Sequence, residues 1–163
     1  MKITLGVRTA ETAALYFEKT NCEIFRKVLP QKAKTKEEAV ADFYTSQRPD
    51  ADSFGRTIYA DEQYIGDIWC YCIDSAGPVN AMVSYCVFEP SLWGQGAATQ
   101  ALRLFLPEIT LRYGLAVVGA FTYADNLPFI RVLEKNGFRL LENFVEDGIA
   151  SSYFQLDLHQ KEV

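Results

Sequence analysis

The stretch Trp93-Gly94-Gln95-Gly96-Ala97-Ala98-Thr99 joins an apolar segment, Val83 to Phe88, to a segment in which apolar residues recur with helical spacing. Its glycines let the backbone come close to a ligand, and the first turn of a helix leaves several N–H groups without an intrahelical partner. The helix dipole alone favours an anion there by about 0.3–1 kcal/mol. The stretch therefore predicts either a phosphate-binding turn or an ordinary tight connection.

A second segment follows farther along the chain. It reads Asp125-Asn126-Leu127-Pro128-Phe129-Ile130-Arg131-Val132-Leu133-Glu134-Lys135-Asn136-Gly137-Phe138. Proline is tolerated in the first helical turn, where its missing N–H costs nothing, and glycine is favoured as the left-handed residue after a helix end. The segment predicts a short helix over about Pro128 to Asn136, followed by a strand.

Together, the two segments closely resemble the GNAT superfamily of acyl-CoA-dependent N-acetyltransferases. The first is similar to the Q/R-x-x-G-x-G/A coenzyme A loop, with Gly96 and Ala98 at the small-residue positions. The second is similar to the N-x-x-S-x-R-V-L-E-K-x-G-F segment of the branch that includes ribosomal-protein N-terminal acetyltransferases. The resemblance implies the α+β GNAT fold, a mixed, mostly antiparallel twisted sheet flanked by helices. In that fold the strands ending here at Phe88 and Tyr123 splay apart to admit the pantetheine arm.

The resemblance also implies acetyl-CoA as co-substrate and an amine as acceptor, either a protein N-terminus or a small molecule. A backbone N–H around Val87 or Phe88 would polarise the thioester carbonyl, and the amides of the glycine loop would hold the diphosphate. Asn126 would hydrogen-bond the pantetheine arm or the acceptor side. Arg131 would reach the nucleotide end of coenzyme A or, alternatively, pair with Glu134 on the helix surface. The predicted cofactor-binding residues are Val87, Phe88, Trp93, Gly94, Gln95, Gly96, Ala97, Ala98, Thr99, Asn126, Phe129 and Arg131.

Four positions depart from the family pattern. Trp93 opens the glycine loop, where an arginine or glutamine is usual in the family. Phe129 replaces the serine of the helical segment, Leu133 stands where some relatives have a tyrosine acid, and Met82 falls near the position of a glutamate base. The nearest carboxylates, Glu89 and Asp125, are typical of solvated strand and helix ends. Other candidates for the acid are water and Tyr123, and the only histidine, His159, is expected to be exposed near the end of the chain. No catalytic acid or base is therefore assigned.

Two functions from different classes are compatible with these residues. The first is an acetyl-CoA-dependent N-acetyltransferase, and the second is a catalytically weak acyl-CoA-binding module that acts as a sensor or partner protein. A nucleotide-binding protein is disfavoured, because Gln95 stands where a phosphate-binding lysine is expected and no lysine-threonine pair follows.

Composition indicates one domain over residues 1–163, and the resemblance implies that it is an N-acetyltransferase domain. The chain is 49% hydrophobic, which is enough for one core, and it lacks an apolar run long enough to cross a bilayer. We therefore expect a cytoplasmic protein without a membrane partner. The net charge of −5 argues against nucleic-acid binding and suits a cationic amine. A symmetric homodimer is the default expectation for a soluble enzyme of this size.

The cysteines, Cys22, Cys70, Cys72 and Cys86, could form two disulfides or a metal site. Cys70 and Cys72 lie in a strand pattern that would direct both to one face, and no C-x-x-C or nearby histidine supports metal binding. Buried, reduced thiols are the preferred interpretation, and no metal is expected.

The spacing of apolar residues, together with turn and capping residues, predicts the remaining elements. Expected strands are Ile3 to Val7, Phe54 to Ala60, Gln63 to Ile73, Asn80 to Phe88, Leu115 to Tyr123, Phe138 to Phe144 and Ser151 to Leu158. Expected helices are Ala10 to Lys19, Lys36 to Ser46 behind a Thr35/Glu38 capping box, and the one after the glycine loop, which Pro107 should kink or restart before Gly114 ends it. The segment up to Pro30 is ambiguous, and the nearly all-apolar strand Leu115 to Tyr123 is expected to be covered on both faces.

Aromatic residues gather on the three-strand meander. They are Tyr64, Trp69, Tyr71 and Tyr85. Core packing accounts for most of them, but strand alternation places Trp69 and Tyr71 on one face, where they could line an acceptor pocket. Such a pocket would favour an apolar or peptide-like acceptor over a small polycation.

Overall fold

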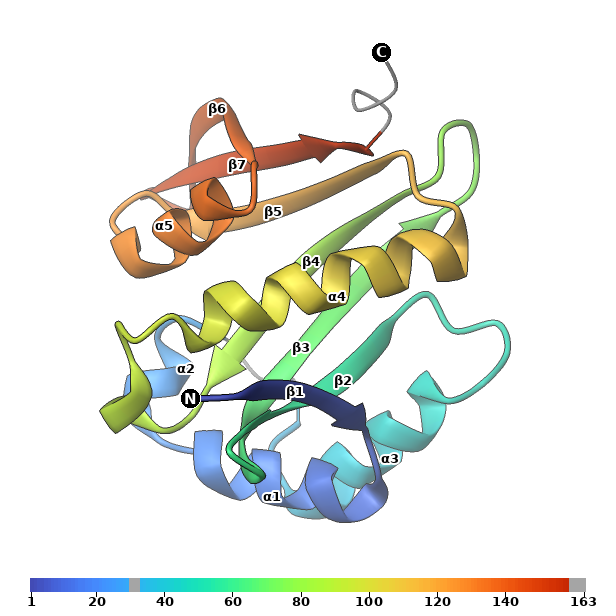
Figure 1. The fold of residues 1–163 in the computed structure, drawn as a ribbon, viewed down its shortest axis with the longest axis vertical. Coiled ribbons are helices and arrows are strands. Elements are labelled where there is room, and N and C mark those ends of the chain that lie inside the picture. Colours follow the sequence, from blue (N-terminus) through green and yellow to red (C-terminus); the bar gives the residue numbers. More distant parts are fainter. Residues whose placement is uncertain (30–32, 159–163) are drawn as a thin grey trace.

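The computed structural model describes residues 1–29 and 33–158 (Figure 1). Its strands are β1 (Ile3–Val7), β2 (Phe54–Ala60), β3 (Gln63–Asp74), β4 (Asn80–Val87), β5 (Val117–Tyr123), β6 (Arg139–Glu146) and β7 (Ile149–Asp157). Its helices are α1 (Ala10–Thr20), α2 (Glu23–Arg26), α3 (Lys36–Ser46), α4 (Ala97–Tyr113) and α5 (Leu127–Lys135), with a 3₁₀ turn, η1, at Pro90–Leu92. His159 lies outside the described residues.

All seven strands belong to one sheet, in the order β1-β2-β3-β4-β5-β7-β6. Neighbouring strands are antiparallel except β4 and β5, which run parallel. The meander β2-β3-β4 is thus confirmed, and α4 carries the chain across to the parallel strand, as such a pair requires. The predicted mixed, mostly antiparallel α+β sheet is also confirmed.

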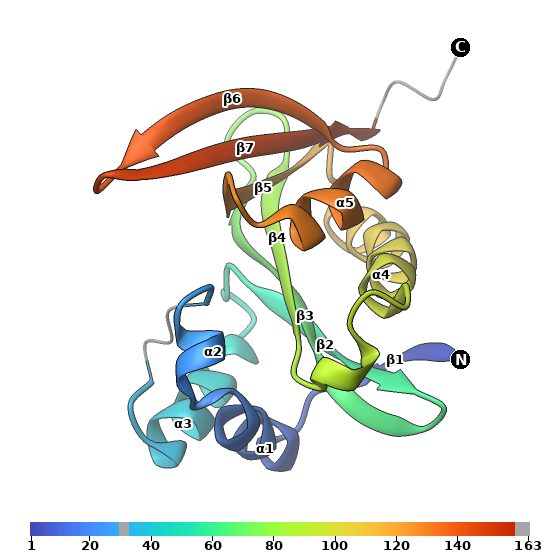
Figure 2. The ribbon, with the colours of Figure 1, turned by 90° about the vertical axis from the view of Figure 1, so that its left-hand side faces the viewer.

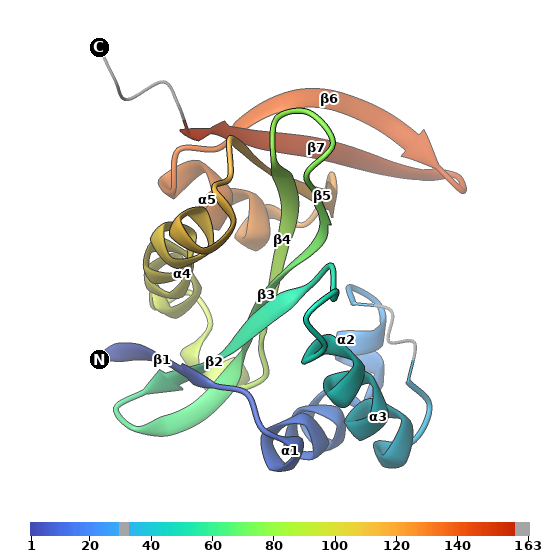
Figure 3. The ribbon, with the colours of Figure 1, turned by 90° about the vertical axis from the view of Figure 1, so that its right-hand side faces the viewer.

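Helices α4 and α5 cover one face of the sheet, whereas α1 to α3 cover only part of the other (Figures 2 and 3). The main core lies between the sheet and α4 and contains fully buried side chains from both layers. They include Ile58, Ile65, Ile68, Val83, Leu102, Phe105, Ile109, Val118 and Leu133. A smaller cluster joins Phe25 of α2 to Cys86 and Phe88 at the end of β4, with Tyr16 of α1 packed against it.

Local capping explains where the N-terminal helices begin. The Oγ atoms of Thr9 and Thr35 accept hydrogen bonds from the backbone N–H groups of Thr12 and Glu38, each at 3.1 Å. The predicted capping box at Thr35 is confirmed on the threonine side only, because the Glu38 carboxylate accepts from the Lys34 N–H at 2.9 Å. The other predicted elements are confirmed apart from small shifts at their ends, and α2 fills part of the ambiguous segment.

Pro107 does not restart α4, which runs as one helix of 17 residues from Ala97 to Tyr113. Because Pro107 is exposed, the carbonyl left without its helical donor, that of Arg103, lies on the solvent side of the helix. Buried Phe105 and Ile109 on the opposite side hold both halves against the sheet. Their packing outweighs the proline penalty of about 3 kcal/mol.

Strand β5 is fully covered on the α4 face but only partly covered on the other, so the expectation of full cover on both faces is wrong at Phe121. Val118 and Ala120 are fully buried against the α4 side, whereas Phe121 on the other side is 52% exposed. An apolar run cannot distinguish a strand buried on both faces from one that leaves an aromatic side chain at a site.

The four cysteines are free thiols, but only Cys70 and Cys86 are buried. Cys22 precedes the short helix α2, and Cys72 has a φ of 51° at a register shift between β3 and β4, which breaks the strand alternation. The interpretation of four buried thiols is therefore wrong for Cys22 and Cys72. Across residues 1–29 and 33–158, no group of potential metal ligands occurs, and no helix is long and apolar enough to span a membrane.

Burial predicts two classes of thiol reactivity. It raises the pKa of Cys70 and of Cys86 to about 12, so neither forms appreciable thiolate at mildly alkaline pH. We expect a disulfide reagent at about pH 8 to label Cys22 and Cys72 in the folded protein and all four thiols after denaturation. Rapid labelling of Cys86 in the folded state, located by peptide mass spectrometry, would contradict this packing.

Gly66 makes the close approach of β3 to β4 possible. A Cβ there would lie 2.0 Å from the Cys86 carbonyl oxygen and 2.9 Å from Val87 Cα, both backbone atoms. We expect Gly66→Ala to push the strands apart and lower the free energy of unfolding by about 1–3 kcal/mol, measured by denaturant titration.

The matched control is Gly148→Asn in the β6–β7 turn. Nothing lies within 4 Å of its Cβ position, and asparagine tolerates its left-handed φ of 77°. If Gly66→Ala were no less stable than this control, the close approach would not constrain the strands.

Candidate functional site

Strands β4 and β5 are paired over only part of their length. Their parallel register pairs Asn80 to Met82 with Val117 to Gly119 and ends there, although β4 continues to Val87 and β5 to Tyr123. Past Met82 and Gly119 the two strands therefore leave a gap in the middle of the sheet (Figure 1). The splay that the family resemblance implied is confirmed.

Hydrogen-bond alternation identifies the backbone groups that face this gap. The Phe88 N–H donates to the Ile65 carbonyl at 2.8 Å, so Phe88 and every second residue before it face β3. Val87 and Tyr85 consequently direct their backbone groups away from β3, towards β5. The same alternation against β7, where the Ala124 N–H donates to the Ala150 carbonyl at 2.9 Å, directs the backbone of Phe121 towards β4.

Of the two residues predicted to polarise a carbonyl, only Val87 therefore offers its N–H to the gap. The Phe88 N–H is engaged with β3 and its ring is buried, 5.0 Å from the ring of Tyr64. This distinction depends on strand register, which the sequence pattern alone does not specify.

The glycine loop leads directly into the uncapped start of α4. Gly94 and Gly96 have φ values of 76° and 86°, left-handed conformations that favour glycine. Gly96 is the N-cap and contributes no side chain, the first helical bond is donated by Gln100 N–H, and the first turn holds no acidic residue. The N–H groups from Ala97 to Thr99 thus lack intrahelical partners, and the dipole there favours an anion.

Trp93 fastens this loop to the end of β4. Its Nε1–H donates to the Val87 carbonyl at 2.8 Å, and its ring packs edge-on against Phe25 at 6.0 Å. Gln95 secures the same loop by donating from Nε2 to the Ser91 carbonyl at 2.8 Å. The side chain of Trp93 thus links the loop to the residue whose N–H faces the gap.

Helix α5 borders the gap on the α4 side. Asn126 is its N-cap, and its Oδ1 accepts from the Phe129 N–H at 3.4 Å. The Phe129 ring meets Tyr85 of β4 edge-on at 5.1 Å, so these two aromatic rings approach each other where the strands separate. At the other end of α5, Asn136 donates to the Thr99 carbonyl at 3.3 Å and ties α5 to the first turn of α4.

Leu133 and Met82, at the positions where some relatives carry a catalytic acid or base, have apolar side chains that cannot transfer a proton. Leu133 is fully buried in the main core, and Met82 lines a shallow hollow on the opposite face. Burial also raises the pKa of Tyr85 well above its ordinary value, which disfavours its phenolate. Arg131 is exposed and forms no ion pair within the part of the chain that the structure describes, and Asp125 is exposed.

A buried polar cluster supports the end of β4 from the α1 side. Asp67 forms an ion pair with Arg8 at 3.2 Å and accepts a hydrogen bond from the Tyr64 hydroxyl at 2.6 Å. Burial raises the pKa of the Asp67 carboxyl, while Arg8 acts in the opposite direction. Burial also raises the pKa of Tyr16, and the adjacent Cys86 thiol acts in the same direction. The sequence offered no signal for this cluster, because Arg8 and Tyr16 are far from Tyr64 and Asp67 along the chain.

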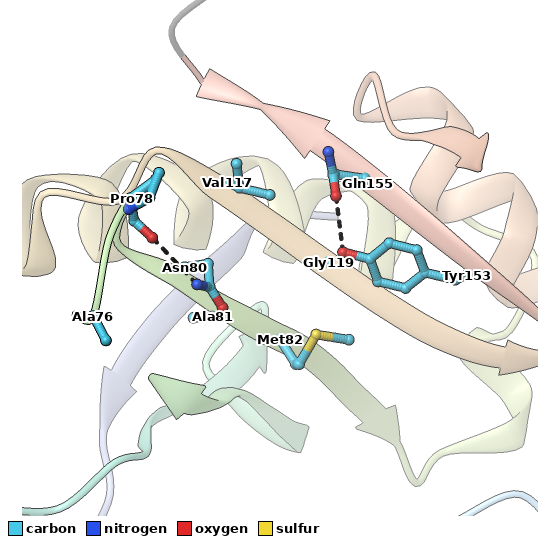
Figure 4. Close-up of a pocket in the computed structure, with 9 residues that line it drawn as sticks. All are labelled: Ala76, Pro78, Asn80, Ala81, Met82, Val117, Gly119, Tyr153 and Gln155. Atoms are coloured by element: carbon cyan, nitrogen blue, oxygen red, sulfur yellow. Dashed lines mark hydrogen bonds between the residues drawn. The ribbon is translucent and has the colours of Figure 1, made fainter. Parts of the chain in front are cut away.

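The hollow lies at the end of the gap where the pairing of β4 and β5 stops, on the face of the sheet opposite α4 (Figure 4). It has a volume of about 250 Å³ and includes Met82 and Gly119, the last registered pair of β4 and β5. Tyr153 and Gln155 of β7 form its far wall. Neither residue was predicted for the site, and the one available signal was a glycine inside an otherwise apolar strand.

Comparison with known protein families settles the fold family. The family described as Acetyltransferase (GNAT) domain matches residues 5–139. The chain belongs to the GNAT acetyltransferases. No curated protein sequence matches it.

Solved GNAT structures share the fold at low sequence identity. RimL, a ribosomal L7/L12 α-N-protein acetyltransferase in complex with coenzyme A, has a TM-score of 0.82 and 17% identity, with 96% of this chain and 94% of that chain covered. RimJ of Mycobacterium smegmatis, with CoA-disulfide, has a TM-score of 0.82 and 18% identity, with 99% and 84% covered. The aminoglycoside acetyltransferase AAC(6')-Ib, with coenzyme A, has a TM-score of 0.80 and 16% identity, with 96% and 95% covered.

We expect Trp93→Phe to weaken binding of coenzyme A, because the loop loses its bond to the Val87 carbonyl while the aromatic contact with Phe25 is kept. Loss of one hydrogen bond of about 1 kcal/mol predicts roughly fivefold weaker binding, measured by calorimetry. The control is Trp69→Phe, since Trp69 lies on β3 and has no bond to the loop. Equal affinities for wild type and Trp93→Phe would show that this anchor does not organise the loop.

Proposed function

We propose that this GNAT protein transfers the acetyl group of acetyl-CoA to a primary amine, either a protein N-terminus or a small-molecule amine. The observation that carries the proposal is the gap between β4 and β5, which opens beside the uncapped first turn of α4. RimL and AAC(6')-Ib, named for an α-N-protein and an aminoglycoside substrate, both contain coenzyme A in structures of this fold.

The proposed placement of coenzyme A uses backbone groups throughout. The diphosphate accepts hydrogen bonds from the N–H groups between Gly94 and Thr99, where the helix dipole adds to them. The pantetheine amides pair with the strand edges that line the gap, much as an added strand would. Asn126 and Phe129 border this arm, and the exposed Arg131 side chain reaches the nucleotide end.

In the proposed reaction, the thioester supplies an activated acetyl carbonyl beside Val87. The Val87 N–H donates to the carbonyl oxygen and stabilises the negative charge that develops as the amine attacks. The nitrogen–carbon bond forms and the amine loses a proton to water. The carbon–sulfur bond then breaks, and coenzyme A leaves with the electron pair as its thiolate, which takes up a proton from water. Holding amine and thioester together contributes about 7–11 kcal/mol to lowering the barrier, so a site without an assigned acid or base can still function.

A catalytically weak acyl-CoA-binding module is the second candidate. It is favoured by Leu133 and Met82, which place apolar side chains where relatives have reactive groups. Acetyl-CoA turnover separates the candidates: amine-dependent release of free thiol above the hydrolysis background supports the enzyme. Saturable coenzyme A binding without turnover across peptides and small amines supports the module.

A cytoplasmic location, a homodimer and the absence of nucleic-acid and membrane partners stay predictions from the sequence.

We expect Val87→Pro to remove the proposed carbonyl donor without breaking the β3–β4 ladder, because the Val87 N–H faces the gap and not β3. Loss of one oxyanion donor predicts a fall in kcat of about 10²- to 10³-fold, measured by steady-state kinetics. Val87→Ala, which keeps the N–H, is the control and should retain most activity. If both variants had the same kcat, the Val87 N–H would have no role in polarising the thioester.

A further inference from the structure

Coenzyme A, placed as proposed, enters the gap between β4 and β5 at its wide end. The glycine loop lies beyond the end of β4, and the Trp93 Nε1–H ties it to the Val87 carbonyl at 2.8 Å. With the diphosphate at the loop and the thioester carbonyl at the Val87 N–H, the sulfur lies on the loop side of Val87. The acyl chain therefore points along the gap towards its narrow end, where Met82 and Gly119 are paired.

Tyr85 is the next residue of β4 whose backbone borders the gap along this path. It lies two residues before Val87, about 7 Å along the strand, and its ring packs against the main core on the α4 side. Continuing the β4–β5 register by three residues past its last pair places Thr122 of β5 opposite Tyr85. Thr122 is buried and, by strand alternation with Ala120, also points to the α4 side. The two side chains thus face α5 from opposite edges of the gap.

Phe129 closes this part of the gap. Helix α5 lies beside the gap (Figure 1), and its Phe129 ring meets the Tyr85 ring edge-on with the centroids 5.1 Å apart. At that distance the rings are in contact and leave no space for an alkyl chain between them. The related family segment has a serine at this position, so the ring of Phe129 fills volume that a serine would leave open.

Helix α5 cannot readily carry the Phe129 ring away. Leu133, one turn farther along the same helix face, is fully buried in the main core. The Asn136 Nδ2–H donates to the Thr99 carbonyl at 3.3 Å, and the Phe129 N–H donates to Asn126 Oδ1 at 3.4 Å. A longer acyl chain would therefore have to displace a packed helix, and forcing extra methylenes into a packed core is unfavourable.

We propose that contact between the Tyr85 and Phe129 rings limits the transferred acyl group to acetyl, and that Phe129 is the specificity-determining residue. The inference rests on the proposed function, with the thioester at Val87. An acetyl group ends one carbon beyond the carbonyl, whereas propionyl and butyryl groups carry further methylenes towards the rings. Selection acts through lack of space, because both rings are apolar surfaces that an alkyl chain would otherwise contact favourably.

The test uses the full chain with acetyl-CoA, propionyl-CoA and butyryl-CoA, each with the same amine acceptor. For wild type, kcat/KM should fall at least about tenfold from acetyl-CoA to propionyl-CoA and further for butyryl-CoA. Phe129→Ala should raise kcat/KM for butyryl-CoA at least about tenfold. The Kd of free coenzyme A, which carries no acyl group, should stay close to that of wild type.

Two further variants make the outcome specific. Phe54→Ala is the matched control, because Phe54 is a half-buried ring stacked on Phe105 at 6.1 Å and lies on β2, away from the gap. It should lower stability without changing the preference among the thioesters. Phe129→Leu keeps an apolar side chain but removes the ring contact, so it should give an intermediate preference. If thermal melting shows that Phe129→Ala does not fold, Phe129→Leu decides the matter.

Kinetic results can overturn the inference by itself. A wild-type protein that transfers butyryl as readily as acetyl would do so and would leave amine acylation intact. An acetyl-to-butyryl preference that is unchanged in the folded Phe129 variants would have the same meaning.

Binding measurements separate the inference from the function on which it rests. Calorimetry gives the Kd values of acetyl-CoA and butyryl-CoA without any need for turnover. If no amine were acylated, but wild type bound acetyl-CoA at least about tenfold more tightly and Phe129→Ala removed that difference, the acyl limit would stand and the proposed function would fall. Equal Kd values together with no acylation would overturn both.

Discussion

Parallel pairing between β4 and β5 covers Asn80 to Met82 and Val117 to Gly119 and then stops, although both strands continue. Backbone N–H and C=O groups require partners, and leaving one buried without a partner costs about 1–3 kcal/mol. A gap lined by such groups in the middle of a sheet therefore suits an amide-bearing ligand, which is the role proposed for it with coenzyme A. Every other feature of the site either keeps the strands apart or positions a group beside the gap.

Contacts on both faces maintain this geometry. On the α4 side, α5 is tied to the first turn of α4 through Asn136, and the Tyr85 and Phe129 rings meet where the strands part. On the α1 side, the buried Asp67 cluster and the Phe88 ring support the last residues of β4. The Trp93 indole joins the loop to the same strand end. The turn proposed to bind phosphate and the N–H proposed to face the carbonyl are thus parts of one connected segment.

Local sequence signals predicted most of the elements, because caps, glycines and apolar periodicity act over a few residues. Thr9, Thr35 and Gly114 mark helix ends as expected, and the glycine loop leads into a helix. Features that depend on distant partners could not be predicted in the same way. The continuity of α4 through Pro107 comes from packing on the sheet, and the exposure of Cys72 comes from a register shift.

The site shows the same division. The loop and the start of α5 were predicted, but the distinction between Val87 and Phe88 required the β3–β4 register. The place of Tyr153 in the hollow could not be predicted, because it depends on the space left by the missing side chain at Gly119 on a neighbouring strand.

Amide hydrogen exchange followed by nuclear magnetic resonance tests the central claim most directly, because it reports on the unpaired strand edges themselves. In the free protein, the N–H groups of Tyr85, Val87 and Phe121 should exchange faster than those of Ser84 and Cys86, which face β3. Addition of coenzyme A should slow the first group and leave the second unchanged. Equal protection of both groups in the free protein, or no change in Val87 and Phe121 at saturating coenzyme A, would contradict the account.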